Sequence, residues 1–317
     1  MIRGSRNLFT VRSLSGETEE CRIKGKILKA VEGYYNPIAP GDMVRVENGL
    51  ILGIEERRNL FARFNQKGQA PQILASNVDI ILCVTSPASP PFRPRFLDRV
   101  LLQAEAAGIP AAVICNKYDL AGEDDPDSDW ADIEERFSDY ERIGYPVFRI
   151  SVLTGEGMEE FRHLIAGKFS VLVGQSGVGK SSIVNALVPG SEIKTSAVNE
   201  KYNRGNHTTT QALLLDVPVR DILNRDVSGG YTRIIDTPGI RRFAPAGILP
   251  EEVILHMREF AALAGKCSYG LSCSHETEAG CKIMEAVSAG VIHEDRYESF
   301  LRIRDELSNK QTYPDND

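Results

Sequence analysis

The feature that most constrains the fold is a glycine-rich segment between two apolar runs. Residues 174–181 read Gly-Gln-Ser-Gly-Val-Gly-Lys-Ser, after the run FSVLV and before SSIVNALV. This is the full P-loop pattern, in the strand–loop–helix context that the motif requires. Its glycines let consecutive backbone N–H groups surround a phosphate, and the start of the following helix favours an anion. The segment therefore predicts an α/β fold built around a nucleotide-phosphate site.

A second motif completes the phosphate site. We expect Lys180 to reach the β- and γ-phosphates and Ser181 to supply a hydroxyl to Mg²⁺. Asp236 begins the sequence Asp-Thr-Pro-Gly at the end of an apolar run. It is placed to hold the Mg²⁺ shell through a water, while the Gly239 N–H contacts the γ-phosphate. The loop residues predicted to bind the nucleotide are Gly174, Gln175, Ser176, Gly177, Val178, Gly179, Lys180, Ser181 and Ser182.

A third motif predicts which base the nucleotide carries. Asn116-Lys117-Tyr-Asp119 follows the apolar run AAVIC. A carboxylate at Asp119 can accept hydrogen bonds from both N1–H and the exocyclic amine of guanine, a pair of donors that adenine lacks. Asn116 and Lys117 are expected to brace the loop and cover the base. Ser151, at the end of the run VFRI, either contacts the guanine carbonyl or caps a helix near Thr154.

The order of these motifs is unusual. Ordinary GTPases present the P-loop first, whereas here the base motif at residue 116 and the serine loop at residue 151 both precede it. The same sheet can form if the natural termini are joined and the chain is opened elsewhere, because termini usually lie close together at the surface. The sequence therefore predicts a circularly permuted GTPase domain. Its switch segment after Gly239 would run directly into the C-terminal part and could pull on it.

Composition divides the 317 residues into three parts. The formal net charge is −7, yet residues 1–68 hold 12 Lys and Arg against 8 Asp and Glu. A basic N-terminal part on an acidic chain indicates a local contact with an anionic partner. The expected domains are a small barrel over 1–68, to which the family resemblance given below adds RNA binding, the permuted GTPase domain over 69–245, and a mostly helical zinc-binding domain over 246–317.

The expected elements follow from periodicity. Alternation of apolar and polar residues and the hairpin signal Asn48-Gly49 predict short strands in residues 1–68. An OB-fold is one solution, and an SH3-like barrel or a plain structural module remain alternatives. Farther along, strands and helices alternate, which predicts a mostly parallel sheet covered on both faces. The strands are expected at 78–84, 111–115, 147–150, 170–173 and 231–235, and helices at 94–107, 158–166, 251–264 and 293–307.

A polar segment between the P-loop and Asp236 has the character of a switch. It contains Gly-Asn-His-Thr-Thr, and we assign Thr209 to the Mg²⁺ shell, with Thr208 as the alternative. Ile240 occupies the position where many GTPases have a water-orienting glutamine, and an isoleucine cannot polarise water. His207 is the candidate catalytic residue, because an imidazole can accept a hydrogen bond from the attacking water. The alternative is a histidine that contacts RNA or only solvent.

Four potential metal ligands lie within 15 residues near the C-terminus. They are Cys267, Cys273, His275 and Cys281. Three thiolates and one imidazole suit one tetrahedral Zn²⁺ with no open position, which indicates a structural role. The alternative is three free cysteines and an unrelated histidine. Since the chain has neither a secretory signal nor a membrane-spanning apolar run, we expect a cytoplasmic protein.

The arrangement resembles one family, the ribosome small-subunit-dependent GTPases A, also called RsgA or YjeQ. The segments that carry the resemblance are NKYDL, GQSGVGKSSIVNAL, GNHTTT, DTPGI and the Cys/His block from residue 267 onward. The resemblance covers nearly all the chain. It implies an N-terminal OB-fold, a permuted GTPase domain and a C-terminal zinc domain. It also implies GTP hydrolysis stimulated by the small ribosomal subunit during its late maturation, and it supports His207 as catalytic.

Three functions are therefore compared. The first is a GTPase that binds the small ribosomal subunit and its rRNA, acts as a monomer and uses Mg²⁺ with GTP and one structural Zn²⁺. The second is a GTP-gated RNA-binding module in which slow hydrolysis only resets the protein. The third is a permuted GTPase that acts on the large subunit, which the Cys/His block argues against.

Overall fold

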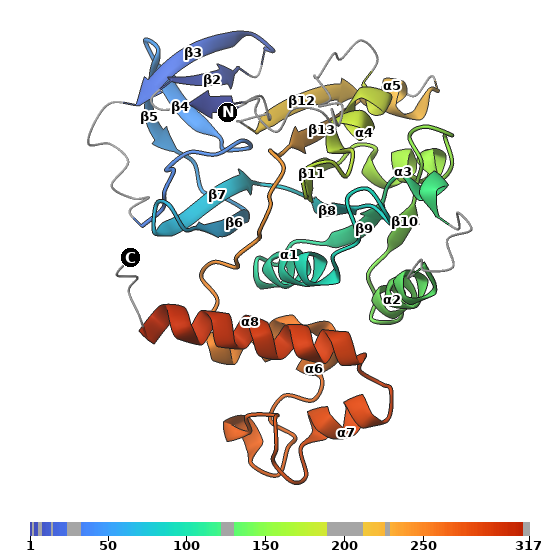
Figure 1. The fold of residues 1–317 in the computed structure, drawn as a ribbon. Coiled ribbons are helices and arrows are strands. Elements are labelled where there is room, and N and C mark those ends of the chain that lie inside the picture. Colours follow the sequence, from blue (N-terminus) through green and yellow to red (C-terminus); the bar gives the residue numbers. More distant parts are fainter. Residues whose placement is uncertain are drawn as a thin grey trace, which may run out of the picture.

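The computed structural model groups the chain into a strand-rich N-terminal part, a central sheet with helices on both faces, and a C-terminal set of helices (Figure 1). At residues 3–5 and 310–312 it describes the backbone alone. The described residues are 1, 3–5, 8–13, 15–23, 33–121, 130–188, 212–225 and 229–312.

The N-terminal part is a five-stranded sheet in the order β1-β2-β3-β5-β4. Neighbouring strands are antiparallel except for the parallel pair β3–β5, a Greek-key arrangement that fits the expected OB-fold. Asn48 and Gly49 both have positive φ between β4 and β5, which confirms the predicted two-residue turn. The strands are β1 (Arg3–Ser5), β2 (Leu8–Arg12), β3 (Thr18–Ile23), β4 (Val44–Glu47) and β5 (Leu50–Ile54).

A separate hairpin connects this sheet to the rest of the molecule. It consists of β6 (Leu60–Asn65) and β7 (Ala70–Ser76), and sequence periodicity did not predict it. Residue 68, the expected domain boundary, lies in the loop between its two strands. The Phe64 N–H donates to the Ala244 carbonyl, 2.8 Å away, so the hairpin also contacts the segment that leaves the central sheet.

The central sheet has six strands in the order β10-β9-β8-β11-β13-β12. Five are parallel, as predicted, and β12 is an antiparallel edge strand that the sequence did not predict. Their side chains are mostly buried because helices cover both faces. The strands are β8 (Ile80–Thr85), β9 (Ala111–Cys115), β10 (Val147–Arg149), β11 (Phe169–Gly174), β12 (Leu213–Pro218) and β13 (Tyr231–Asp236).

Two apolar cores lie on opposite faces of this sheet. Helices α1 and α2 contribute to one core, and α3, α4 and α5 contribute to the other. α1 and α3 match the predicted helices within one residue, whereas α2 was not predicted. The helices are α1 (Pro94–Ala106), α2 (Trp130–Arg142), α3 (Met158–Ile165), α4 (Lys180–Leu187) and α5 (Val219–Leu223).

The C-terminal part contains short helices around α8 (Glu294–Thr312), which confirms the last predicted helix and extends it. The single helix predicted over 251–264 is wrong. Met257 has an extended backbone with φ −110° and ψ 112°, which divides this segment into two short helices. No helix among the described residues is long and apolar enough to cross a membrane. The short helices are η3 (Pro250–His256), α6 (Arg258–Ala261), η4 (Gly270–Ser272) and α7 (Lys282–Ser288).

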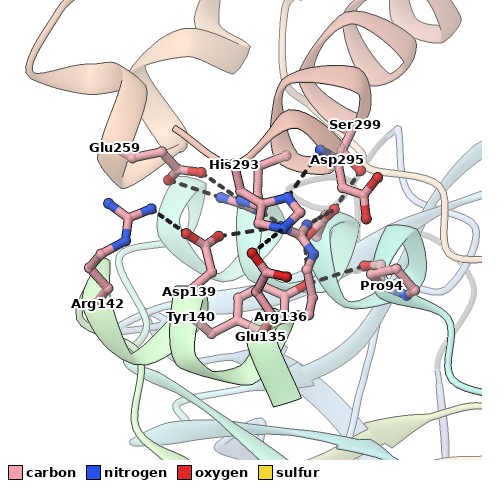
Figure 2. Close-up of polar contacts among 12 residues, drawn as sticks. Pro94, Glu135, Arg136, Asp139, Tyr140, Arg142, Glu259, His293, Asp295 and Ser299 are labelled. Carbon is pink, nitrogen blue, oxygen red and sulfur yellow. Dashed lines mark hydrogen bonds and ion pairs between the residues drawn. The ribbon is translucent and has the colours of Figure 1, made fainter. Parts of the chain in front are cut away.

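A buried ionic network joins these helices to the central domain. Asp98 of α1 has no exposed surface. It accepts hydrogen bonds from Arg296 Nη1 at 2.8 Å and Tyr140 Oη at 2.6 Å, and also from Ser299. Figure 2 shows Tyr140 of α2 beneath Glu259 of α6 and Ser299 of α8. The C-terminal helices are thereby held against α1 and α2 by charged groups that are almost completely buried.

Candidate functional site

The predicted nucleotide motifs meet at one edge of the central sheet. β9, β10, β11 and β13 run parallel, so their carboxyl ends lie on the same side. Asn116 follows β9, Ser151 follows β10, the P-loop follows β11, and Asp236 ends β13. Motifs separated by up to 120 positions in the sequence are therefore adjacent in space, despite their permuted order.

The base motif and the P-loop touch directly. The Asn116 side-chain amide donates to the Val178 carbonyl at 3.0 Å. Gly177 and Gly179 both have φ of +90°, a conformation that favours glycine. A Cβ added to Gly179 would lie 2.2 Å from Asn116 Nδ2, so only glycine permits this approach. The contact joins the segment that precedes the P-loop in this chain to the loop itself.

Lys180 lies at the start of α4 with its ammonium group in the loop. It is 6% exposed, and Nζ donates to the carbonyls of Gly174 at 2.9 Å and Gln175 at 2.8 Å. Burial lowers the pKa of Lys180 to about 8, although the carboxylate of Asp236 opposes this. Backbone oxygens thus hold the lysine in a buried position that disfavours its charge.

Ser181 and Asp236 form the adjacent polar pair. Ser181 Oγ lies 3.1 Å from Asp236 Oδ2, while Oδ1 is buried without a hydrogen-bond partner. Burial raises the pKa of Asp236, with Lys180 and Ser181 opposing the shift. A hydroxyl and a carboxylate with a free buried oxygen suit a hydrated Mg²⁺, which binds oxygen ligands and keeps several waters.

The segment after Asp236 packs on the P-loop. A Cβ on Gly239 would lie 2.8 Å from Ser176 Cα, and the Ile240 N–H donates to the Gly174 carbonyl at 3.1 Å. The Ile240 side chain is buried in the core beside the sheet. It therefore cannot orient a water molecule, because it is buried and its aliphatic side chain has no hydrogen-bonding group.

The predicted base-binding residues form a second connected group. Ser151 is fully buried, donates to the Asp119 carboxylate, and accepts the Thr154 N–H at 3.1 Å. It therefore caps a turn and not a helix, since the nearby helix α3 has Gly157 at its N-cap, and it also orients Asp119. Lys117 begins the short helix η2 (Tyr118–Leu120) with φ of 60°. Burial lowers the pKa of Lys117, and Asp119 opposes this effect.

A loop that the motif search missed completes the site. After β8 the chain reads Ser-Pro-Ala-Ser-Pro-Pro-Phe. The Ser89 carbonyl accepts a hydrogen bond from the Lys117 ammonium group. Pro90 lies 3.4 Å from the position that a Cβ of Gly177 would occupy. Its proline-rich composition after a buried strand was the available signal. The switch residues His207, Thr208 and Thr209 lie outside the described residues.

The four predicted metal ligands form one buried cluster in the C-terminal part. Their ligand atoms lie within 4.8 Å of one another. His275 Nδ1 is 3.5 Å from the sulfurs of Cys267 and Cys281, and these two sulfurs are 3.9 Å apart. In a tetrahedral zinc site with typical metal–ligand bond lengths, a nitrogen and a sulfur ligand lie about 3.6 Å apart, and two sulfur ligands lie about 3.8 Å apart. With Cys273 as the fourth ligand, the cluster could hold a metal ion.

Relatives of similar length match almost the whole chain. A "Small ribosomal subunit biogenesis GTPase RsgA" from Bacteroides fragilis is 36% identical over 308 residues, covering 95% of this chain and 94% of the relative. The protein of the same description from Chlorobaculum parvum is 34% identical over 313 residues, covering 94% of each chain. Among solved structures, YjeQ from Thermotoga maritima is 30% identical with a TM-score of 0.69, covering 96% of both chains.

A second solved structure and a family profile agree with these matches. YloQ, described as a circularly permuted GTPase, has a TM-score of 0.64 and 27% identity, covering 99% of this chain and 95% of that one. The profile of the RsgA GTPase family matches residues 54–245, which hold every nucleotide motif described above. Together with the permuted order of those motifs around one sheet, these matches show that the chain is a circularly permuted GTPase and belongs to the RsgA GTPase family.

Proposed function

We propose that this GTPase binds the small ribosomal subunit and hydrolyses GTP to GDP and phosphate during late maturation of that subunit. The observation that carries the proposal is the contact between the base motif and the P-loop, through Asn116 and Val178, in a permuted domain. The small subunit as partner is supported by the descriptions of relatives that match almost the full length of the chain.

The described residues support specific roles toward GTP. The Asp119 carboxylate, oriented by Ser151, would accept N1–H and the exocyclic amine of guanine. The amides of the P-loop would surround the phosphates, and Lys180 would leave its carbonyl partners to pair with the β- and γ-phosphate oxygens. Ser181 and Asp236 would hold Mg²⁺, which neutralises charge on those oxygens when bound.

Hydrolysis requires a group that the described site does not supply. Because Ile240 is buried and apolar, the group that orients the attacking water must come from elsewhere, and the switch is the source that we propose. His207 would accept a hydrogen bond from that water, and Thr209 would complete the Mg²⁺ shell. Docking on the ribosomal subunit would bring the switch into its active position, so that turnover is slow without it.

The other two parts of the chain would serve RNA recognition. The barrel at residues 1–68 would contact rRNA through its basic surface, and residues 246–317 would be shaped by one structural Zn²⁺ on Cys267, Cys273, His275 and Cys281. The GTPase domain at 69–245 would connect the two. We propose that the protein acts as a monomer in the cytoplasm, with GTP and GDP as its exchanging ligands.

The test is GTP turnover by wild type, His207→Ala and His163→Ala, with and without purified small subunits. His163 is a matched control because it is half exposed on α3, away from the motifs. Small subunits should raise turnover of wild type and His163→Ala. His207→Ala should lose this stimulation by about 100-fold or more, while its affinity for GDP stays that of wild type.

Each other outcome has a defined meaning. Full stimulation of His207→Ala would contradict the catalytic assignment. Binding of wild type to small subunits without stimulation would favour the GTP-gated RNA-binding module. Co-sedimentation with large subunits alone would refute the proposed partner.

A further inference from the structure

A basic cavity lies beside the nucleotide site and borders it at one P-loop residue. Its volume is about 470 Å³, and its walls come from the start of α1, the P-loop residue Gln175, the segment 241–243 and α8. Six arginines and three carboxylates line it. A positive excess at this position is unexpected in a chain whose net charge is −7.

Only some of these arginines are neutralised by ion pairs. Arg99 pairs with Glu306 at 2.6 Å, and Arg136 pairs with Asp98 at 3.2 Å. Arg93 and Arg241, by contrast, are exposed and form no ion pair within the described part of the chain. The cavity therefore has neutralised arginines in its depth and uncompensated ones at its rim.

The neighbouring arginines add to this excess. Arg242 reaches Glu306 only at 3.6 Å and is 62% exposed. Arg95 pairs with Glu298 while both side chains are nearly half exposed. Exposed pairs of this kind contribute about 1 kcal/mol or less, so an anion can compete for either arginine.

The basic surface continues beyond this cavity. Arg241 and Arg242 also line a second cavity of about 650 Å³, which reaches β6 and the N-terminal sheet. Arg63 of β6 lines it too, its buried Nε has no hydrogen-bond partner, and no carboxylate is among the residues of this lining. Arginines thus follow a path from α1, across residues 241–242, to β6. A path that crosses two cavities suits a linear polyanion better than a single small phosphate.

We propose that this path, from Arg93 through Arg241 and Arg242 to Arg63, binds backbone phosphates of ribosomal RNA. The proposal rests on the proposed function, since it names a surface for the partner given there. Its position couples RNA to the nucleotide, because Ile240 next to Arg241 donates to the Gly174 carbonyl of the P-loop. RNA held by these arginines would fix the segment that follows Asp-Thr-Pro-Gly against the phosphate site.

The salt dependence of subunit binding tests this directly. Each phosphate contact removed should reduce the slope of log affinity against log salt concentration by about 0.7 to 1. We would measure small-subunit affinity with a non-hydrolysable GTP analogue at KCl concentrations from about 50 to about 300 mM. Arg93→Gln should reduce the slope by about 1, and Arg93→Gln with Arg241→Gln by about 2. Arg220→Gln is the matched control, because Arg220 is 66% exposed on α5 and lines neither cavity.

The outcomes separate this inference from the proposed function. If wild type does not bind small subunits, the proposed function fails. If wild type binds and the double variant keeps the wild-type slope, the RNA path is refuted. Weaker binding with an unchanged slope would also refute it, since the arginines would then contact something other than phosphates. GDP affinity, measured for every variant, should equal that of wild type and shows that the domain is folded.

Discussion

Removing the charge of Asp98 should loosen the C-terminal helices from the central domain. Asp98 is fully buried in α1, while Arg296 and Ser299, which donate to it, belong to α8. Asp98→Asn keeps the shape of the side chain but leaves Arg296 and Arg136 with one carboxylate fewer in a buried network. We therefore expect α8 to separate from α1 more easily.

The structure sets the magnitude. Arg296 keeps Glu259 as a partner and Arg136 keeps Asp139, so the variant loses charge-assisted hydrogen bonds and leaves neither arginine without a carboxylate. Such bonds contribute about 1.5 to 3 kcal/mol, so amides of α8 that exchange by opening of this interface should exchange about 10- to 150-fold faster in the variant. Hydrogen exchange followed by mass spectrometry measures this locally, which suits a chain of several parts.

A matched control links the same two helices. Arg95 of α1 and Glu298 of α8 form an exposed pair, so Arg95→Gln should cost about 1 kcal/mol or less. If Asp98→Asn accelerated exchange in α8 no more than Arg95→Gln does, the buried network would not hold the helices and the reasoning would be refuted.

The pKa of Asp98 determines how its stabilising effect changes with pH. Burial acts to raise the pKa of Asp98, but Arg296 and Arg136 outweigh it, and the pKa lies below its ordinary value. A carboxyl whose pKa is lower in the folded state stabilises that state above its unfolded pKa of about 3.9. The advantage of wild type over Asp98→Asn should persist down to about pH 4 and shrink as the pH falls further.

Three further predictions concern the nucleotide and metal sites. Gly179→Ala should weaken GDP binding, measured by calorimetry, by at least about tenfold, because its Cβ would lie 2.2 Å from Asn116 Nδ2. Gly108→Ala is the control, since Gly108 also has a positive φ but open space around it, and it should leave GDP affinity unchanged. Because the pKa of Lys180 is about 8 and bound phosphates would raise it, GDP affinity should fall by up to about tenfold per pH unit above pH 8; a constant affinity between pH 7 and 9 would contradict this. Metal analysis should find one Zn²⁺ per chain and much less in Cys273→Ser, and a chelator that leaves the proteolytic resistance of residues 246–317 intact would argue against a structural metal.

The nucleotide site was predictable because its residues are determined locally. Glycines with positive φ, such as Gly177 and Gly179, leave a direct mark in the sequence, and the base motif and the P-loop lie at the ends of the fully buried strands β9 and β11. Parallel strands then place the motifs at one edge, whatever their order along the chain. The hairpin at Asn48-Gly49 was predictable for the same reason, since its turn requires those residue types.

Features that depend on distant partners were not predictable. Asp98 looks like one more charge on an amphipathic helix, yet its partners Arg296 and Ser299 lie about 200 positions away. The hairpin β6–β7 alternates too weakly to stand out and is held by contacts such as Phe64 with Ala244. At Met257 an extended backbone interrupts a helical pattern in the sequence, and the side chain packs in the core of the C-terminal part.

The central claim is that motifs from separate segments converge on one guanine nucleotide, with Asp119 reading the base. Calorimetry with GDP, ADP and xanthosine diphosphate on wild type and Asp119→Asn tests it most directly. Wild type should prefer GDP over ADP by at least about 100-fold. Asp119→Asn should lose about 10- to 150-fold in GDP affinity, because charge-assisted hydrogen bonds contribute about 1.5 to 3 kcal/mol, and should gain affinity for the xanthine base, whose carbonyl can accept the asparagine amide. ADP bound as tightly as GDP, or an unchanged preference in the variant, would contradict the claim.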